Sequence, residues 1–392
     1  MIRQNNKNIV KYHLTDKKNG TIVTQTVCAV LFTVFSFLWL YWFQADVLYV
    51  AQHVLSRGHT HYNRLVGALL IIGVLMFLQQ IVMAVVRLRR RTHALTYFPS
   101  MLVLAYITDV EQALQHGFSR WTWLLPVLLV LWGGMVWLAK QMMPFDVEKQ
   151  PTGLLSRRVW INTLLMALMM LGVAALANTH AVFHFRAHAE VALLHNDFDE
   201  ALRVGRRSHE TDASLTMLRA YALARQGLMG ERLFEYPVAG KGKDLMPFAD
   251  SSSKLLVMKA DSLYRCCGAM PVGVKTAKRY FYLLEKDSLA TKAVADYRLC
   301  GMLIDRKIDE FARTITRYYG IGDALPRHYR EALTLYTHLR SQPVAVYKHA
   351  VLDEDWADMQ KLKSKYPDEK ERKNRVAERY FGSYWYYYFY GK

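Results

Sequence analysis

Three histidines lie four residues apart, at His180, His184 and His188. In a helix, side chains at this spacing share one face. Imidazole nitrogens bind zinc, and histidine also titrates near neutral pH. Packing at a membrane surface, with the polar ring tips in water, explains the same spacing without a metal. We expect no cofactor. The one metal site that the sequence suggests is a zinc ion bound by these three histidines.

The stretch that carries the histidines begins at the end of an apolar run and continues into polar sequence. We expect residues 177–202 to form one helix that leaves a membrane near Ala177 and turns at Asn196 and Asp197. The composition changes at the same place. Residues 1–179 contain 16 Lys+Arg and 6 Asp+Glu, which leaves 35 of the 51 basic and 27 of the 33 acidic residues for residues 180–392. The sequence thus predicts an all-α protein with a tail at 1–20, a transmembrane region at 21–178 and a soluble domain at 179–392.

Five segments of the first half are apolar: 21–43, 65–86, 94–108, 121–142 and 159–177. A helix needs about 20 apolar residues to cross a bilayer, so 94–108 is short for a span. Basic residues gather in three places, within 1–20, at 87–91 and within 140–158. All three lie on the cytoplasmic side only if 94–108 crosses the membrane. We expect five spans and a periplasmic C-terminal domain; four spans would leave that domain in the cytoplasm.

The second half has the apolar spacing of amphipathic helices. The sequence HNDFDEAL at 195–202 resembles the turn between the two helices of a tetratricopeptide repeat. A weaker copy, RQGLMGERLF, follows at 225–234, so that Gly227 comes 31 residues after Asn196, near the usual period of 34. Residues 296–320 predict a further helix pair joined near Asp305. The pattern favours a solenoid-like array, whose usual role is to bind partner proteins.

Three stretches of the second half resemble an uncharacterised family of multi-span membrane proteins from Bacteroidetes. They are DYRLCGMLIDRKIDEFARTITRYYG at 296–320, LPRHYREALTLY at 325–336 and YFGSYWYYYFYGK at 380–392. The resemblance implies a bacterial inner-membrane location. It implies no activity and no site residues, because the family is a domain of unknown function.

Neither a nucleic-acid-binding motif nor a compact catalytic motif occurs in the sequence. We therefore expect an inner-membrane protein that presents its helical domain for protein–protein interaction or scaffolding, with no nucleic-acid partner. The alternative is a membrane enzyme that acts on lipid-linked or cell-wall glycan. The run of seven aromatic residues at 384–390 has three interpretations, in our order of preference: a cap on the helical array, an anchor at the membrane interface, or a surface that stacks on a sugar or partner.

Overall fold

The computed structural model describes residues 22–88, 90–109, 120–142 and 156–391. Every regular element in these ranges is a helix, so the all-α prediction is confirmed. The chain divides into two compact units, Met1–His180 and Ala181–Lys392, which are described separately below. The predicted tail at 1–20 lies outside the described residues.

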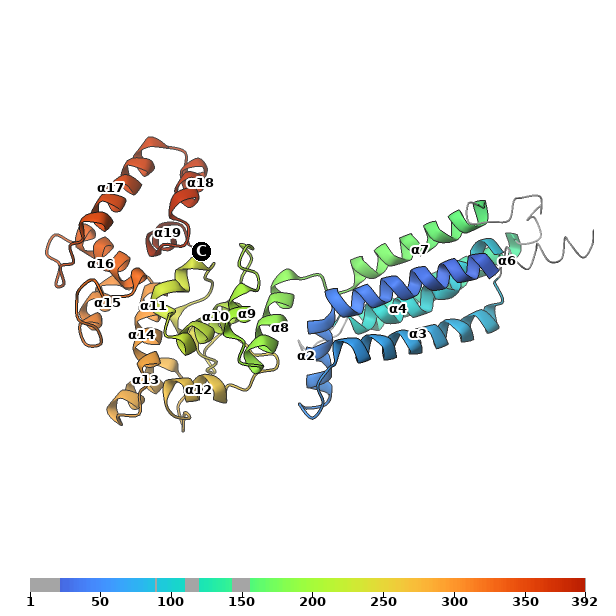
Figure 1. The fold of residues 1–392 in the computed structure, drawn as a ribbon, viewed down its shortest axis with the longest axis horizontal. Helices are drawn as coiled ribbons and strands as arrows, with labels where there is room; N and C mark the ends of the chain where they lie inside the picture. The colour runs from blue at the N-terminus through green and yellow to red at the C-terminus, as the bar shows by residue number, and fades with distance from the viewer. Residues whose placement is uncertain (1–21, 89, 110–119, 143–155, 392) are drawn as a thin grey trace, which may run out of the picture. The chain divides into compact units, whose positions relative to one another are not determined.

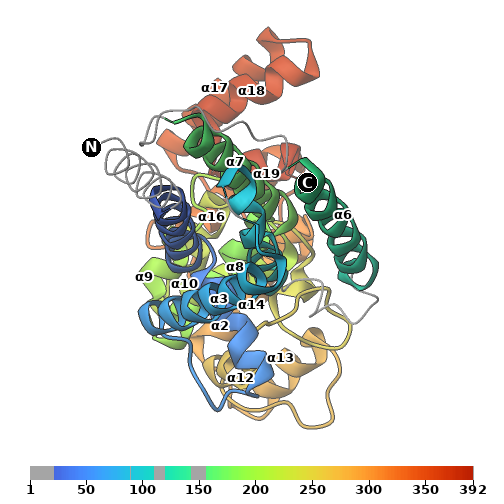
Figure 2. The ribbon, with the colours of Figure 1, turned by 90° about the vertical axis from the view of Figure 1, so that its right-hand side faces the viewer.

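Four helices of the first unit are long and apolar enough to cross a membrane. The last turn of the first of these helices, Trp39–Phe43, is π-helical. Helix α6 is the least buried of the four and lies at the edge of the bundle (Figures 1 and 2). The elements of this unit are Ile22–Phe43, α2 (Ala45–Leu55), α3 (Arg64–Val86), η2 (Arg90–Tyr97), α4 (Phe98–Ile107), α6 (Trp121–Met142) and α7 (Arg157–Leu176).

The short apolar segment at 94–108 is a 3₁₀-helix followed by an α-helix, η2 and α4. It runs parallel to α7. The Ala94 amide donates to Asn162 Oδ1 (2.7 Å) near the start of α7, and the Asn178 amide donates to the Thr108 carbonyl (3.4 Å) just beyond its end. From Asn162 to Leu176, the last residue of α7, the helix rises by about 21 Å. The 3₁₀ portion gains more length per residue than an α-helix does, which explains how so few residues extend along most of α7.

Buried polar groups tie these helices together. Gln79 on α3 donates to the Thr96 hydroxyl (3.0 Å), and the Ser100 hydroxyl donates to the Leu75 carbonyl (2.8 Å). Such bonds between apolar helices replace the water that the groups have lost. They fix α3 against η2 and α4.

The buried carboxylate of Asp109 links helix ends at one end of the first unit. Asp109 accepts a hydrogen bond from the Trp121 indole (2.7 Å) and forms an ion pair with Arg120 (2.8 Å). Arg120 also donates to the Leu176 carbonyl at the end of α7. These bonds hold the ends of α4, α6 and α7 at one place.

The second unit is built of shorter helices around one hydrophobic core. The sequence-predicted pair near Asp305 is present as α14 and α15. The elements are α8 (Ala181–Leu194), α9 (Phe198–Arg203), α10 (Ala213–Gln226), α11 (Met229–Arg232), η4 (Leu233–Glu235), η5 (Gly242–Leu245), α12 (Asp261–Cys267), α13 (Ala277–Lys286), α14 (Lys292–Ile304), α15 (Ile308–Ile315), α16 (Arg327–Leu339), α17 (Ala350–Lys365), α18 (Glu369–Tyr380) and α19 (Tyr384–Tyr390).

Three helix pairs of this unit share one kind of turn, which also ends α13 at Ser288 (φ 58°, with the Leu289 amide 2.9 Å from the Leu284 carbonyl). Asn196 after α8, Gly227 after α10 and Arg306 after α14 all have left-handed backbone, with φ of 58°, 70° and 57°. In each turn the next amide donates to the carbonyl five residues earlier, at 2.9 Å in all three. This is the Schellman arrangement, which satisfies carbonyls that a helix end leaves unpaired. The two turns that the sequence indicated thus have a third counterpart between α14 and α15.

The aromatic run at 384–390 forms helix α19 and packs into the core. Tyr384 and Trp385 are almost completely buried. The Tyr384 hydroxyl donates to the Leu303 carbonyl (3.3 Å) and the Tyr387 hydroxyl donates to the Ile304 carbonyl (3.0 Å), so the run also caps the end of α14. Of its three interpretations, the structure supports the cap.

A buried carboxylate on α16 holds α19 in place. Glu331 accepts hydrogen bonds from Arg327 Nε (2.9 Å), His328 Nδ1 (3.0 Å) and the Tyr384 amide (2.6 Å). The Phe234 amide nitrogen lies 3.3 Å from His328 Nε2. Burial raises the pKa of Glu331, but His328, Arg327 and the Tyr384 amide outweigh it and hold that pKa below its ordinary value.

Candidate functional site

The predicted continuous helix through the histidines is wrong. Helix α7 ends at Leu176 and α8 begins at Ala181, so His180 lies outside the helix that carries His184 and His188. The break is centred on Asn178. Its carbonyl accepts from Gln44 Nε2 (3.1 Å), and its side-chain oxygen accepts from the His180 amide (2.8 Å). The Asn178 amide donates to the Thr108 carbonyl (3.4 Å) and so does not make the bond to the fourth residue before it that a continuing helix needs.

The three histidines therefore do not share one helical face. His188 Nε2 lies 3.3 Å from Glu200 Oε1 on α9, and the His184 ring meets the Phe183 ring edge to face. Among the described residues, no group of three or more His, Cys, Asp or Glu side chains is arranged to hold a metal ion. Zinc binding at His180, His184 and His188 stays a prediction. Their spacing no longer supports it, because the three residues do not lie in one helix.

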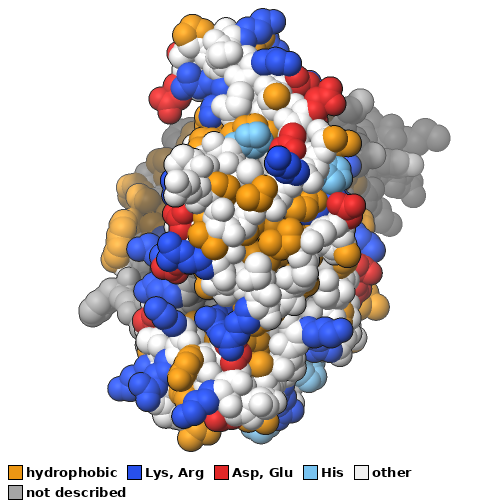
Figure 3. Space-filling model, turned by 90° about the vertical axis from the view of Figure 1, so that its left-hand side faces the viewer, with side chains coloured by type: hydrophobic (Ala, Val, Ile, Leu, Met, Phe, Trp, Pro, Cys, Tyr) orange, Lys and Arg blue, Asp and Glu red, His pale blue; other side chains and the backbone are white. Residues whose placement is uncertain are grey.

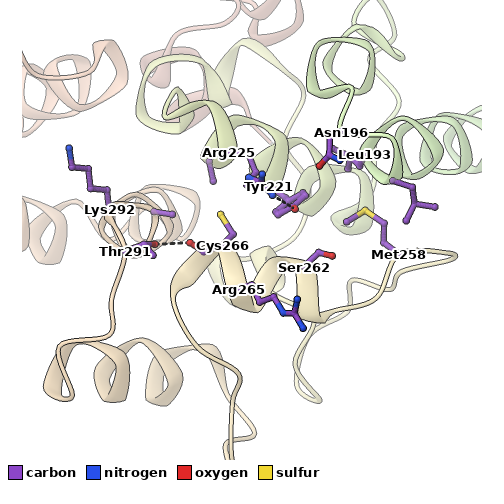
Figure 4. A pocket seen from close by; sticks show the side chains of 13 residues that line it. Leu193, Asn196, Tyr221, Arg225, Met258, Ser262, Arg265, Cys266, Thr291 and Lys292 are labelled. Carbon is purple, nitrogen blue, oxygen red and sulfur yellow. Dashed lines mark hydrogen bonds between the residues drawn. The ribbon is translucent and has the colours of Figure 1, made fainter.

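A cavity of about 610 Å³ opens in the second unit (Figure 4). Four parts of the chain form its walls: the end of α8 with its turn, the end of α10, helix α12 with the residue Met258 before it, and the start of α14. The lining residues are Leu193, Leu194, Asn196, Tyr221, Ala224, Arg225, Met258, Ser262, Arg265, Cys266, Thr291, Lys292 and Ala293. Three cations and no carboxylate are among them.

One of these cations is held in a fixed position. Arg225 donates to the Tyr221 hydroxyl (3.0 Å), and its guanidinium lies over the Phe198 ring at 5.1 Å from the centroid. The other two, Arg265 and Lys292, are exposed and have no ion-pair partner within the described part of the chain. The cavity is therefore positively charged and open to solvent.

A carboxylate outside the cavity positions one of its walls. Glu190 on α8 is fully buried and accepts hydrogen bonds from three successive loop amides, at Leu256 (2.9 Å), Val257 (2.7 Å) and Met258 (3.0 Å). Burial raises the pKa of Glu190, and these three amides act against that rise. The loop is thereby fixed so that Met258 lines the cavity.

Cys266 is the one cysteine of the four that is not buried. Its side chain points from α12 toward Arg225 (Figure 4). Burial of the thiol raises its pKa, and the charge of Arg225 acts in the opposite direction. It is therefore a weak nucleophile at neutral pH, and no His, Asp or Glu among the lining residues can activate it.

A second cavity of about 420 Å³ lies near the end of α14, and its lining includes one carboxylate, Asp305. Lys307 pairs with Asp305 (3.3 Å), and Arg306 donates to the Gly391 carbonyl (2.6 Å). The first cavity differs because its cations have no acidic neighbour in the lining. No sequence motif indicated the first cavity, because its lining residues come from four elements between positions 193 and 293.

Comparison with known proteins gives one family match. A family of unknown function, DUF6057, matches residues 273–391, which include α13 to α19. The stretches at 296–320 and 325–336, which carried the resemblance in the sequence, lie inside this match. No match was found among curated proteins or among solved structures.

Proposed function

We propose that this is a five-span bacterial inner-membrane protein that presents a tetratricopeptide-like helical unit in the periplasm to bind a protein partner. The observation that carries the proposal is the repeated helix pair. Three pairs with the same turn geometry, at Asn196, Gly227 and Arg306, share one core. Stacked helix pairs of this kind usually bind other proteins on their surface.

The five-span arrangement is supported by the course of η2 and α4. This segment runs parallel to α7 over most of its length, as a further span would. With five crossings, the basic residues at 87–91 and 156–158 lie at the same side as the N-terminal tail, as the positive-inside rule requires.

Protease accessibility tests the orientation. Spheroplasts with intact membranes would be treated with protease, and fragments of residues 181–392 would be detected with a tag. We expect digestion of this unit before lysis. Protection before lysis and digestion after it would reverse the orientation and remove the periplasmic part of the proposal.

The surface also offers an apolar region for a partner. Val344, Val346 and Val351, in and just after the connection from α16 to α17, are 70%, 53% and 62% exposed. Exposed apolar side chains that lie close together are typical of interaction surfaces. On the face of the second unit that Figure 3 shows, hydrophobic side chains gather near the middle, and Lys and Arg are frequent below them, at the level of α13.

Photo-crosslinking in living cells tests partner binding. A photoreactive residue at Val344 or Val346 should give a discrete cross-linked product, and the same residue at the exposed Glu354 on α17 is the matched control. The products should be identified by mass spectrometry. Absence of a product at both valines, with expression equal to that of the control, would contradict the proposal.

A further inference from the structure

The exposed face of α13 consists of basic residues and a tyrosine. With about 3.6 residues per turn, Lys278, Arg279, Tyr282 and Lys286 lie within an arc of about 100° around the helix axis. All four side chains are exposed, and the buried residues of α13 lie on the opposite side of the helix. Tyr282 is 61% exposed and lies between the basic residues. We call this surface the basic face of α13.

The positive charge of this face is not offset by acidic neighbours. Glu285, the acidic residue of α13, pairs instead with Arg298 (2.5 Å) and Arg317 (3.2 Å), which belong to other elements. The three basic residues of the face take part in no ion pair within the described residues. Residues 265–292 contain six basic and two acidic residues, an excess of four, whereas all of residues 180–392 have an excess of eight (35 against 27). Half of the excess charge is therefore concentrated around α13.

Exposed apolar side chains flank the basic face. The backbone at Gly268 lies against the Leu289 carbonyl, just beyond the end of α13, and the chain then returns through residues 269–276 to the start of the helix. Val272 in this loop is 87% exposed, more than any other large apolar side chain of the described residues, and Leu289 is 53% exposed. Figure 3 shows hydrophobic side chains among the Lys and Arg side chains at this level of the second unit.

This combination fits an anionic lipid surface better than a protein. Basic side chains are attracted to anionic headgroups, and Tyr is favoured at the boundary between headgroups and acyl chains. Lys, by contrast, is depleted in protein–protein interfaces. A membrane is also close at hand. Helix α7, the last of the candidate spans, ends at Leu176, and α8 begins four residues of chain later, at Ala181. Docking on the same membrane is therefore an intramolecular step, which weak contacts suffice to drive.

We propose that the basic face of α13, with Val272 and Leu289 at its margins, docks on the anionic phospholipid headgroups of the membrane in which the chain is anchored. The charges attract the surface to the headgroups, and the apolar side chains enter the boundary beneath them. The proposal rests on the membrane anchoring in the proposed function. It does not depend on the protein partner at 344–351 or on which side of the membrane the second unit lies.

A fluorophore in the loop before α13 tests docking in the full-length protein. Val272→Cys, in a Cys266→Ser background, would be labelled with a nitrobenzoxadiazole group and reconstituted into nanodiscs that contain a lipid spin label near the headgroup. Nanodiscs of phosphatidylcholine are compared with nanodiscs in which one third of the lipid is phosphatidylglycerol. We expect strong quenching with the anionic lipid only, and its loss in molar salt, where the Debye length is about 3 Å. The same label at the exposed Glu354 on α17 is the matched control and should not be quenched.

Charge-removing variants test whether α13 is the docking surface. At the phosphatidylglycerol content that docks half of the labelled protein, Lys278→Gln/Lys286→Gln should lower the ratio of docked to undocked protein about 25-fold, because each basic residue near an anionic membrane contributes about fivefold. The matched control Lys365→Gln/Lys370→Gln removes two exposed charges elsewhere in the unit and should leave the ratio unchanged.

Three results would overturn the proposal. The first is equal quenching at positions 272 and 354, and the second is an equal ratio in the two double variants. The third is the absence of quenching in anionic nanodiscs, which would leave the basic face to an acidic protein. In each case the protein has entered the nanodisc, so the membrane anchoring stands. A chain that does not enter nanodiscs would refute the anchoring and this proposal together.

Discussion

Replacement of Glu331 by alanine should destabilise the second unit strongly. The side chain is 4% exposed and accepts hydrogen bonds from Arg327, His328 and the Tyr384 amide. Alanine would remove all three bonds and leave the His328 and Tyr384 donors in the core without this acceptor. Removal of one partner of a buried charged pair costs about 3–5 kcal/mol. For a unit of about 200 residues, such a loss lowers the midpoint of thermal unfolding by roughly 6–20 °C.

The buried thiol of Cys300 reports on this unit in the full-length protein. It is 0% exposed and becomes reactive only when the surrounding core opens. Samples heated to increasing temperatures would be pulsed with a maleimide, and modification of Cys300 would be measured by peptide mapping. Glu331→Gln, which keeps the shape and one acceptor oxygen, should fall between wild type and alanine. The exposed Glu354→Ala should stay within about 0.5 kcal/mol of wild type. Equal midpoints for Glu331→Ala and Glu354→Ala would refute the stabilising role of Glu331.

The same carboxylate predicts a pH dependence. Because the folded pKa of Glu331 is lowered, its contribution is fully present above the ordinary Glu value of about 4.3. The contribution is lost as the pH falls from there through the lowered folded pKa. Over that acidic window, the thermal midpoint of wild type, measured as resistance of the second unit to a pulse of pepsin, should fall more steeply than that of Glu331→Gln. Parallel curves would mean that Glu331 does not titrate differently on unfolding.

Three further predictions concern close contacts. Gly242→Ala would place its Cβ 2.4 Å from the Gly301 carbonyl oxygen, whereas the Cβ of Gly301→Ala would lie 3.5 Å from its nearest neighbour. In urea unfolding, Gly242→Ala should lower the free energy of unfolding by about 1–3 kcal/mol, and Gly301→Ala should change it little. Glu190→Gln turns an amide group toward backbone N–H donors and should cost about 1–3 kcal/mol, with faster proteolysis of the loop at 251–258. Asp109→Asn weakens the pairing at the end of the first unit and should lower the temperature at which the buried Cys28 becomes reactive; an unchanged temperature would mean that this pairing adds no stability.

The helix pairs were predictable from the sequence because their signals are local. One pattern recurs at Asn196, Gly227 and Arg306: a residue with left-handed backbone, then an apolar residue two positions later and a Glu four positions later. Only Gly227 carries the glycine by which such turns are usually recognised. The turn at Arg306 was therefore expected only as a helix junction, and its equivalence to the others needed the backbone geometry.

The break at Asn178 was not predictable, because its cause is tertiary. The residue follows a long apolar helix and precedes an alanine-rich one, so local preference favours continuity. Bonds from Asn178 to Thr108 and Gln44, 70 and 134 residues away, decide the outcome. The cavity between α8, α10, α12 and α14 escaped prediction for a similar reason, since each of its lining residues is ordinary within its own element.

The position of α19 has a consequence for the order in which the second unit folds. The residues that it contacts on α14 and α16 are synthesised 53–83 residues earlier. Contacts of such long sequence separation form late and slowly. Until α19 arrives, the end of α14 lacks its cap and the apolar surface beneath Tyr384 and Trp385 is open to water. Apolar surface that is exposed in this way favours aggregation and chaperone binding until α19 docks.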